Sequence, residues 1–468
     1  MTTMACYINS LPDEILEYIL NLIPPYKDLT LCTVVCKRWY HAVKRVIEHK
    51  QAYFERSVAY GSLLWSSQSP FCNPEKIGKR HSHSACTNEN SMYIFGGCTK
   101  ASTTFNDLWK LDLDTREWER PMPMGNYPSP KAYSSMVYYK KSFIVFGGWA
   151  SPSSYPIYQR RKLFDELHIY STVTNTWTCI EALDAPPATS AHSATVHGNI
   201  MVVFGGVNDF SNGTNKVWCL NLDTNTWQEQ LTFDPKPHPR YGQSQIFLDE
   251  KHLLIIGGCT GPNVGIDDAW VLTLEGPKWR WNKVTFNGRE WAPMRIWCHQ
   301  ACKVGDHVVL LSKKRQSNQA NNASKESKVR CHGAVSLSKN TVQENKQRLL
   351  PALNPDENVN GRRGEFPVRL RHRQLANINP KKPTNVLSIF ILNIAKVLSD
   401  EHIATWIQHH GIENTGPAER ILYSLVLGRG ELIMFGGVHK MSNNSQSEIE
   451  NSEVYNDIHF IKPPRYAI

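Results

Sequence analysis

Residue types that readily do chemistry are sparse in this 468-residue chain. Cys298, His299 and Cys302 are of types that bind zinc, but neighbouring side chains on a strand point to opposite faces, so Cys298 and His299 would diverge. Cys32 and Cys36 lie about one helical turn apart and are interpreted as packing residues. Neither a Ser-His-Asp arrangement nor a nucleotide-binding glycine loop can be recognised. The sequence therefore predicts no catalytic residues, no metal and no cofactor.

A second group of residues is suited to binding a protein. The segment after Gly147–Gly148 is rich in tryptophan, tyrosine and arginine, the types enriched at binding hot spots. The candidate target contacts in this segment are Trp149, Tyr155, Tyr158, Arg160 and Arg161. Further candidates in comparable loops are Asn208, Phe210, Asn263, Arg240 and Tyr241. The alternative is that these rings pack the loop onto its own sheet.

The scaffold that must carry these loops is repetitive. Apolar runs end in Gly-Gly five times, and tryptophan recurs in step at Trp65, Trp118, Trp177, Trp227, Trp281 and Trp406. About 30 residues separate each tryptophan from the next glycine pair, and after Trp281 this position falls in Val308–Ser312, where the apolar run remains without the glycines. Six units of about 50 residues with short strands predict an all-β six-bladed propeller.

The glycine pair, a spaced aromatic residue and the tryptophan resemble the kelch repeat over residues 61–468, apart from an insertion. The resemblance implies a six-bladed kelch β-propeller that binds protein. A propeller oxidase would need converging Tyr and His side chains with a Cys beside a Tyr, which the sequence does not indicate. Ser62–Trp65 precedes the first repeat and the last repeat lacks its tryptophan strand, so this N-terminal strand is predicted to close the last blade.

The innermost strands carry a recurrent polar side chain. The residues assigned to this position are His83, Tyr133, His192, Gln243, His299 and Tyr423. They could contact a ligand in the central channel, but hydrogen bonding between strands and to channel water is the favoured interpretation.

Residues 1–50 form a separate helical module, joined by a linker at 51–60. An apolar stripe with helical spacing begins at Leu11, and Pro24-Pro25 ends that helix. The runs Leu11–Leu16, Pro24–Leu29 and Val35–Trp39 resemble the F-box family in order and spacing. The resemblance implies docking on the adaptor Skp1, with interface residues Leu11, Pro12, Ile15 and Leu16, and with Leu29, Val35 and Trp39 in the same surface or its supporting core.

The combined resemblance implies a non-catalytic substrate-recognition subunit of an SCF (Skp1–cullin–F-box) ubiquitin ligase, connected through Skp1 to a cullin–RING ligase. Two alternatives stay open. The helices could be only a cap on the propeller, or the chain could be a kelch scaffold that acts outside any ligase.

Charge is concentrated in one segment. The chain carries +10, and residues 313–385 contribute 16 Lys and Arg against 5 Asp and Glu, a balance of +11, which leaves −1 elsewhere. This segment, inserted in the fifth blade, is predicted to be a disordered basic insertion. The folded part is therefore not expected to bind nucleic acid. No signal peptide or membrane span is recognised, and reduced cysteines in the cytoplasm or nucleus are expected.

Overall fold

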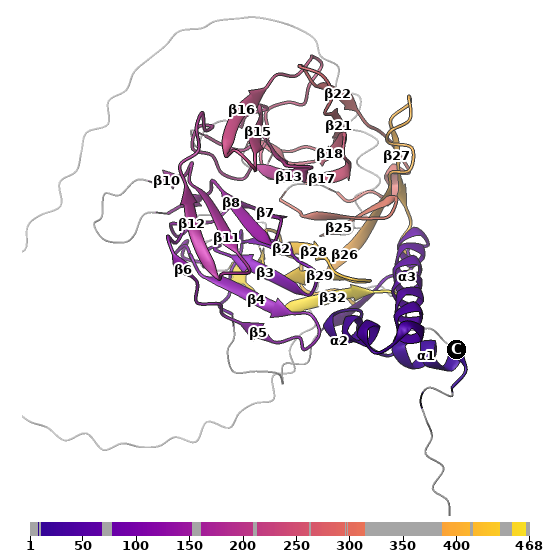
Figure 1. The fold of residues 1–468 in the computed structure, drawn as a ribbon. Coiled ribbons are helices and arrows are strands. Elements are labelled where there is room, and N and C mark those ends of the chain that lie inside the picture. Colours follow the sequence, from indigo (N-terminus) through magenta and orange to yellow (C-terminus); the bar gives the residue numbers. More distant parts are fainter. Residues whose placement is uncertain are drawn as a thin grey trace, which may run out of the picture. The chain divides into compact units, whose positions relative to one another are not determined.

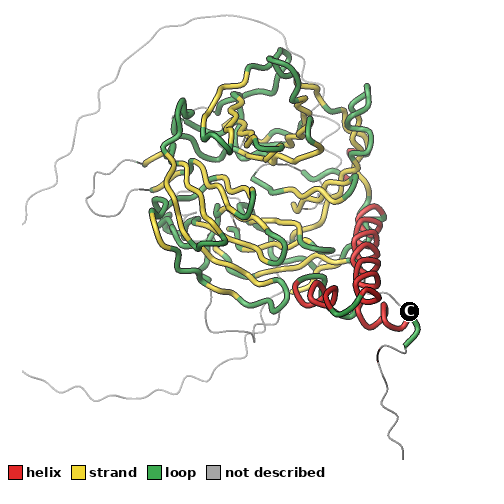
Figure 2. The backbone as a smooth tube through the Cα atoms, viewed as in Figure 1, coloured by secondary structure: helices red, strands yellow, loops and turns green. Residues whose placement is uncertain are grey.

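The computed structural model is a six-bladed β-propeller preceded by a small helical region (Figure 1), which confirms the predicted fold class. The α-helices and the strands occupy separate parts of the chain (Figure 2), and the short 3₁₀ turn η3 (Arg289–Trp291) lies within the propeller. Among the described residues, none of the helices has the length and apolar content needed to cross a bilayer. The structure describes residues 8, 11–67, 77–151, 161–208, 213–261, 264–294, 296, 298–313, 386–411, 415–439 and 452–464.

Four antiparallel strands in chain order make each of the first five blades. Blade 1 consists of β2 (Ser84–Thr87), β3 (Ser91–Phe95), β4 (Leu108–Asp112) and β5 (Trp118–Glu119). Blade 2 consists of β7 (Ser135–Tyr139), β8 (Ser142–Phe146), β11 (Leu167–Ser171) and β12 (Thr176–Ile180). Blade 3 consists of β13 (Ser193–His197), β14 (Ile200–Phe204), β15 (Val217–Asn221) and β16 (Thr226–Gln230). Blade 4 consists of β17 (Ser244–Asp249), β18 (His252–Ile256), β21 (Ala269–Thr273) and β22 (Arg280–Lys283). Blade 5 consists of β24 (Ala301–Val304), β25 (His307–Lys313), β26 (Leu387–Asn393) and β27 (Ile403–Ile407).

Blade 6 is built from both ends of the propeller sequence. Its strands are β28 (Ser424–Leu427), β29 (Leu432–Phe435), β32 (Ile458–Lys462) and the N-terminal β1 (Leu64–Ser67). Trp65 pairs with Ile461 in the β1–β32 ladder, so the predicted closure by an N-terminal strand is confirmed. Closure in this way removes an open sheet edge.

Additional short strands extend some blades or form small ribbons between their strands. A parallel fifth strand is added to blade 2 by β6 (Met124–Gly125) and to blade 5 by β23 (Thr285–Asn287). The connections between second and third strands form two-stranded ribbons in three blades: β9 (Trp149–Ala150) with β10 (Lys162–Leu163), β19 (Cys259–Gly261) with β20 (Val264–Gly265), and β30 (Val438–His439) with β31 (Glu453–Val454).

The helical region comprises α1 (Asp13–Asn21), α2 (Lys27–Leu31), the 3₁₀ turn η2 (Cys32–Val34) and α3 (Lys37–Ala59). Asp13 and Glu14 occupy the first turn of α1, where negative charge is favourable. The three helices share a small core of Leu16, Leu20, Leu29, Ala42, Val43 and Val46. The linker predicted at 51–60 is helical, because α3 continues without a break to Ala59.

The glycine pairs join neighbouring blades. In five joints the second glycine amide donates to a carbonyl of the next blade at 2.8–3.0 Å: Gly97 to Lys131, Gly148 to Thr189, Gly206 to Arg240, Gly258 to Ile296, and Gly437 to Arg80. A Cβ on Gly147, where φ is +66°, would lie 2.5 Å from the Thr189 carbonyl oxygen of the next blade. The repeat therefore requires glycine for close backbone approach.

Contacts between aromatic rings add to four of the five regular joints. The phenylalanine before a glycine pair meets the tryptophan of the next blade: Phe95 with Trp177, Phe146 with Trp227, Phe204 with Trp281, and Phe435 with Trp118, at ring centroid distances of 4.7–5.4 Å. Such tilted contacts stabilise beyond simple area burial.

A closed ring of six backbone hydrogen bonds runs through all blades. Each donor and acceptor is a residue with positive φ just before the first strand of its blade: Ser82, Tyr133, Ala191, Gly242, Cys298 and Leu422. Each amide donates to the carbonyl of the preceding member, at 2.8–3.0 Å in five links and 3.3 Å from Leu422 to Cys298. Tyr133 was assigned to the recurrent polar position, which is wrong, because it belongs to this ring and Ser134 occupies the polar position of blade 2.

The recurrent polar residues reach the preceding blade. His83 Nε2 lies 2.9 Å from Ser424 Oγ, His192 Nε2 lies 2.9 Å from Ser135 Oγ, and Gln243 donates to the Phe204 carbonyl at 2.8 Å. All three side chains are buried. They form part of the joints, in agreement with the expected hydrogen bonding between strands.

The joint between blades 5 and 6 is built differently. Ser312 and Lys313 stand where other blades carry two glycines. The Tyr423 hydroxyl donates to the Leu311 carbonyl at 2.7 Å. Phe54 and Val58 of α3 are buried in one apolar cluster with strands of both blades. A helix of the N-terminal module is thus part of the propeller core at this joint.

Candidate adaptor-binding and target-binding surfaces

The helical region is attached to the propeller through a buried carboxylate. Tyr26 donates to Glu431 Oε1 at 2.5 Å, and Arg116 and Lys462 lie within 2.7 Å and 3.2 Å of the same carboxylate. Burial, reinforced by the negative charge of Glu431, raises the pKa of Tyr26, so its hydroxyl remains a donor. The Lys27 amide also donates to Asp114 at 2.5 Å. These contacts hold the helices in a defined place on the propeller.

The contacts of the helices and the candidate target residues lie at opposite ends of the blades. Glu431 lies in a turn between first and second strands, and Arg116 lies between third and fourth strands. Trp149 and Asn208 follow second strands. Because antiparallel strands reverse direction, these two kinds of connection emerge at opposite ends. An adaptor and a target could bind the chain together without competing for space.

The predicted adaptor residues divide into core and surface. Leu16 and Leu29 are fully buried in the helical core, so they support the surface and are not part of it. Ile15 is 46% exposed and Val35 58% exposed. Leu11 and Trp39 are half-buried, and Pro12 is exposed. The interpretation of Leu16 as an interface residue therefore needs correction, because α3 already covers its side chain.

Three apolar residues that sequence reasoning missed are among the most exposed in the module. They are Leu22 (69% exposed), Leu31 (54%) and Val34 (80%). For Leu22 and Leu31, the available signal was their place outside the stripe that forms the helical core. Together with Ile15 and Val35 they form what we call the apolar surface of the module. A large share of exposed apolar side chains on such a small module is typical of a binding surface.

Ion pairs hold the helices that carry this surface. Arg38 contacts Asp13 at 2.7 Å and also donates to the Leu11 carbonyl, while Arg45 contacts Glu17 at 2.6 Å. These pairs join α3 to α1. The pairs are partly exposed, so each contributes little stability, but they restrict the relative rotation of the helices.

At the other end of the blades, Trp149 and Arg161 form a contact. The Arg161 guanidinium lies 5.9 Å from the Trp149 ring centroid, and the Tyr133 ring meets Trp149 edge-on at 5.9 Å. Trp149 is half-buried and Arg161 exposed, so both packing on the blade and contact with a partner are possible for the tryptophan. Asn208 is exposed and Tyr241 is half-buried at equivalent ends of other blades. Tyr155, Tyr158, Arg160, Phe210 and Asn263 lie outside the described residues.

Arg240 does not belong to this surface, which corrects its assignment as a target contact. Its side chain is 0% exposed, pairs with both carboxylate oxygens of Asp268 at 2.6 and 3.1 Å, and donates to the Gly257 carbonyl at 3.0 Å. Burial alone would raise the pKa of Asp268, but its hydrogen bonds with Arg240 keep that pKa below the usual value. Arg80 forms the same clamp with Asp107.

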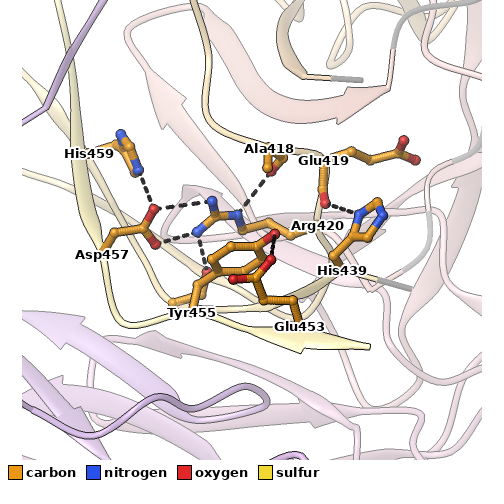
Figure 3. Close-up of polar contacts among 9 residues, drawn as sticks. Ala418, Glu419, Arg420, His439, Glu453, Tyr455, Asp457 and His459 are labelled. Carbon is orange, nitrogen blue, oxygen red and sulfur yellow. Dashed lines mark hydrogen bonds and ion pairs between the residues drawn. The ribbon is translucent and has the colours of Figure 1, made fainter. Parts of the chain in front are cut away.

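The corresponding clamp in blade 6 is surrounded by further polar side chains (Figure 3). Arg420 pairs with Asp457, and the guanidinium stacks 3.6 Å from the centroid of the Tyr455 ring. His459 Nε2 lies 2.8 Å from the same carboxylate. Burial opposes the charge of Asp457, but His459 and Arg420 hold its pKa well below the usual range. The network lies within one blade, and we interpret it as structural.

Cys298 and Cys302, which lie close in sequence, have different partners in the structure. Cys302 donates to the Leu425 carbonyl of blade 6, while Cys298 lies in the backbone ring and its thiol contacts that of Cys259. Cys259 also contacts Tyr241, so a Cys beside a Tyr, which the sequence did not indicate, does occur here. In the part of the chain that the structure describes, no group of three or more His, Cys, Asp or Glu side chains could hold a metal ion.

Comparison with known proteins agrees with this architecture. Residues 8–48 match the family model described as F-box-like, and residues 80–279 match the model described as FBX42, beta-propeller domain. Human Kelch domain-containing protein 3 is 29% identical over 264 residues, covering 53% of this chain and 66% of that protein. The rat protein of the same name is 29% identical over 199 residues, covering 42% of this chain.

The chain spans about half the length of the first of these relatives, 52% of the rat protein. A solved structure described as "Structure of YjhT" aligns with a TM-score of 0.50 at 14% identity, covering 83% of this chain and 96% of the other, which supports the fold alone. The two family models match separate regions of the chain and confirm both resemblances found in the sequence. The chain therefore combines an F-box-like region with a β-propeller that matches the FBX42 propeller model.

Proposed function

We propose that this chain is a non-catalytic substrate receptor of an SCF-type ubiquitin ligase, with Skp1 bound by its helical module. The observation that carries the proposal is the apolar surface of the module, whose side chains stay exposed although Tyr26 already anchors the module to the propeller. Burial of such residues on a partner is strongly favourable in water. The F-box-like match supports Skp1 as the partner.

The propeller would hold the protein target at the end of the blades opposite the helices. Trp149, Arg161, Asn208 and Tyr241 are the described candidates for that contact. Such a receptor contributes proximity: it raises the effective concentration of target lysines near the ubiquitin-loaded enzyme that the cullin–RING assembly brings. None of the described cysteines is in a disulfide, which supports a reducing location in cytoplasm or nucleus.

The test is binding of the purified chain to Skp1. Val34→Glu/Val35→Glu should weaken binding roughly thirtyfold or more, because two charges would be desolvated in an apolar interface. Leu183→Glu, at an exposed apolar residue on the propeller, is the matched control and should bind like wild type. All three proteins should unfold at similar temperatures.

Failure of the folded wild-type chain to bind Skp1 would overturn the proposal and leave the helices as a cap. Binding to Skp1 without cullin co-purification would instead support a kelch scaffold that acts outside a ligase.

A further inference from the structure

The propeller repeat brings two thiols together at the joint between blades 4 and 5. Cys259 directly follows the glycine pair of blade 4, and Cys298 is the member of the backbone ring in blade 5. Neither is in a disulfide in this structure. In blade 1 the residue after the glycine pair is also a cysteine, Cys98, but the ring residue of blade 2 is Tyr133. The pairing of two cysteines at these positions is therefore not a general property of the repeat.

Backbone hydrogen bonds hold the two segments on either side of the pair. The Gly258 amide donates to the Ile296 carbonyl at 2.9 Å, and the Cys298 amide donates to the Gly242 carbonyl at 2.9 Å. Cys259 in turn pairs with Tyr241, the neighbour of Gly242, through two hydrogen bonds of 2.9 and 3.1 Å. Both cysteines are thus anchored to the same short segment.

Gly242 provides the space in which the thiols meet. It is the only glycine of the ring, and a Cβ at this position would lie 2.8 Å from Cys298 Sγ. The Cys298 thiol therefore lies directly over Gly242, and the Cys259 thiol donates to the carbonyl of Tyr241, the residue before Gly242, at 3.5 Å, with a hydrogen bond between the two thiols. That hydrogen bond lowers the pKa of Cys259 against the opposing effect of burial, and contact with Tyr241 lowers it further.

We propose that Cys259 and Cys298 are a site of reversible disulfide formation in response to hydrogen peroxide. Cys298 is half-buried and Cys259 is fully buried, so the oxidant reaches Cys298 first. The Cys298 thiolate attacks one peroxide oxygen, giving a sulfenic acid and hydroxide. The Cys259 thiolate then attacks the sulfenic sulfur, the S–S bond forms and a second hydroxide leaves. Two thiols are oxidised, one peroxide is reduced, and a dithiol reductant reverses the reaction.

This site adds a chemical property to the propeller that does not depend on binding to Skp1. The bond would connect two blades beside Tyr241, a candidate target contact. The same surface would then exist in a reduced and an oxidised form.

The test is peptide mapping of the full chain after treatment with hydrogen peroxide, followed by alkylation and digestion. A peptide pair linked through Cys259 and Cys298 is expected, and dithiothreitol should remove the link. Cys36 and Cys179 are exposed and report that the oxidant dose is sufficient. Cys98 is the internal control, and it should be oxidised singly or not at all because Tyr133 takes the place of a second thiol.

Cys298→Ser should abolish the linked peptide while the chain stays folded, because Ser82 occupies the equivalent ring position with the same positive φ. Cys259→Ser should abolish it as well and leave Cys298 as a sulfenic acid that a dimedone probe captures. If Cys36 and Cys179 are oxidised and no Cys259–Cys298 link forms in the wild type, the proposal is overturned. A Cys302 link in its place would overturn it too.

Discussion

The joint between blades 5 and 6 differs from the other five in what holds it. The regular joints combine a glycine pair that donates to the next blade with a polar side chain that reaches back. At the 5–6 joint, tyrosine replaces the polar residue, the ring hydrogen bond is the longest, and two residues of α3 fill the core. The comparison teaches that a joint between blades can lack the glycine pair when apolar side chains of a helix outside the repeat are buried in it.

This difference has a consequence for the N-terminal module. Its helix α3 serves two regions at once, since Val43 and Val46 lie in the helical core and Phe54 and Val58 lie in the propeller core. The F-box region is therefore expected to stabilise the propeller, and its removal should affect the ring where the repeat is weakest.

The largest effect is expected from Phe54→Ala. The substitution removes a buried ring from the 5–6 joint and should lower the free energy of unfolding by about 3–5 kcal/mol. Urea unfolding followed by tryptophan fluorescence measures the change. Gln51→Ala, at an exposed position of the same helix, is the control and should change stability by less than about 0.5 kcal/mol. Equal effects of the two substitutions would show that α3 does not support the joint.

Gly206→Ala tests a regular joint. Gly206 has φ of +97°, and a Cβ would lie 2.8–2.9 Å from atoms of Thr189, His192 and Ser190. We expect a loss of roughly 2 kcal/mol or more from backbone strain and overpacking. Gly198→Ala is the matched control, since φ is +58° there with open space around it, and should cost about 1 kcal/mol. A similar cost at both sites would mean that close approach between blades is not the reason for the glycine pair.

The recurrent polar position carries His192 in blade 3 and Gln243 in blade 4, and this difference predicts that the histidine makes the fold more sensitive to acid. Burial lowers the pKa of His192 to about 3, against about 6.5 in the unfolded chain. The unfolded state therefore binds the proton more tightly, and stability falls as pH decreases from about 6.5 towards 3. His192→Gln, which copies Gln243 of the next blade, should reduce the loss between pH 7 and pH 5 by roughly 1–2 kcal/mol. Unfolding midpoints across this range check it, and an unchanged pH slope would contradict it.

Tyr423→Phe should have the smallest effect of the four. It removes the hydrogen bond to the Leu311 carbonyl and leaves that oxygen buried, at a cost of about 1–2 kcal/mol. Because burial raises the pKa of Tyr423, the loss should be independent of pH between 5 and 8. Tyr139→Phe, at an exposed contact with Asp223, should be nearly neutral by the same denaturation assay. A loss that grows with acidity would indicate that this joint depends on another titrating group.

Most of the fold could be predicted from the sequence because each blade repeats the same short pattern of residues. The spacing of glycine pairs and tryptophans predicts six blades, one degenerate, and the unmatched strand at Ser62–Trp65 predicts the closure. Candidate sites were less predictable. Tyr133 is one residue out of the assigned register, and a shift of one residue on a strand changes the face on which a side chain lies.

The burial of each side chain in the folded chain determined which predicted site residues are on the surface and which are in the core. The sequence by itself determined the order of the modules, the repeat and the F-box-like helices, because helical and strand periodicities and glycine requirements are local. Only the tertiary structure decided that Arg240 is clamped by Asp268, that Leu16 is core while Val34 is surface, and that Cys259 meets Cys298. These contacts join residues distant in sequence, and their energies depend on which groups are removed from water together, a property that no local pattern records.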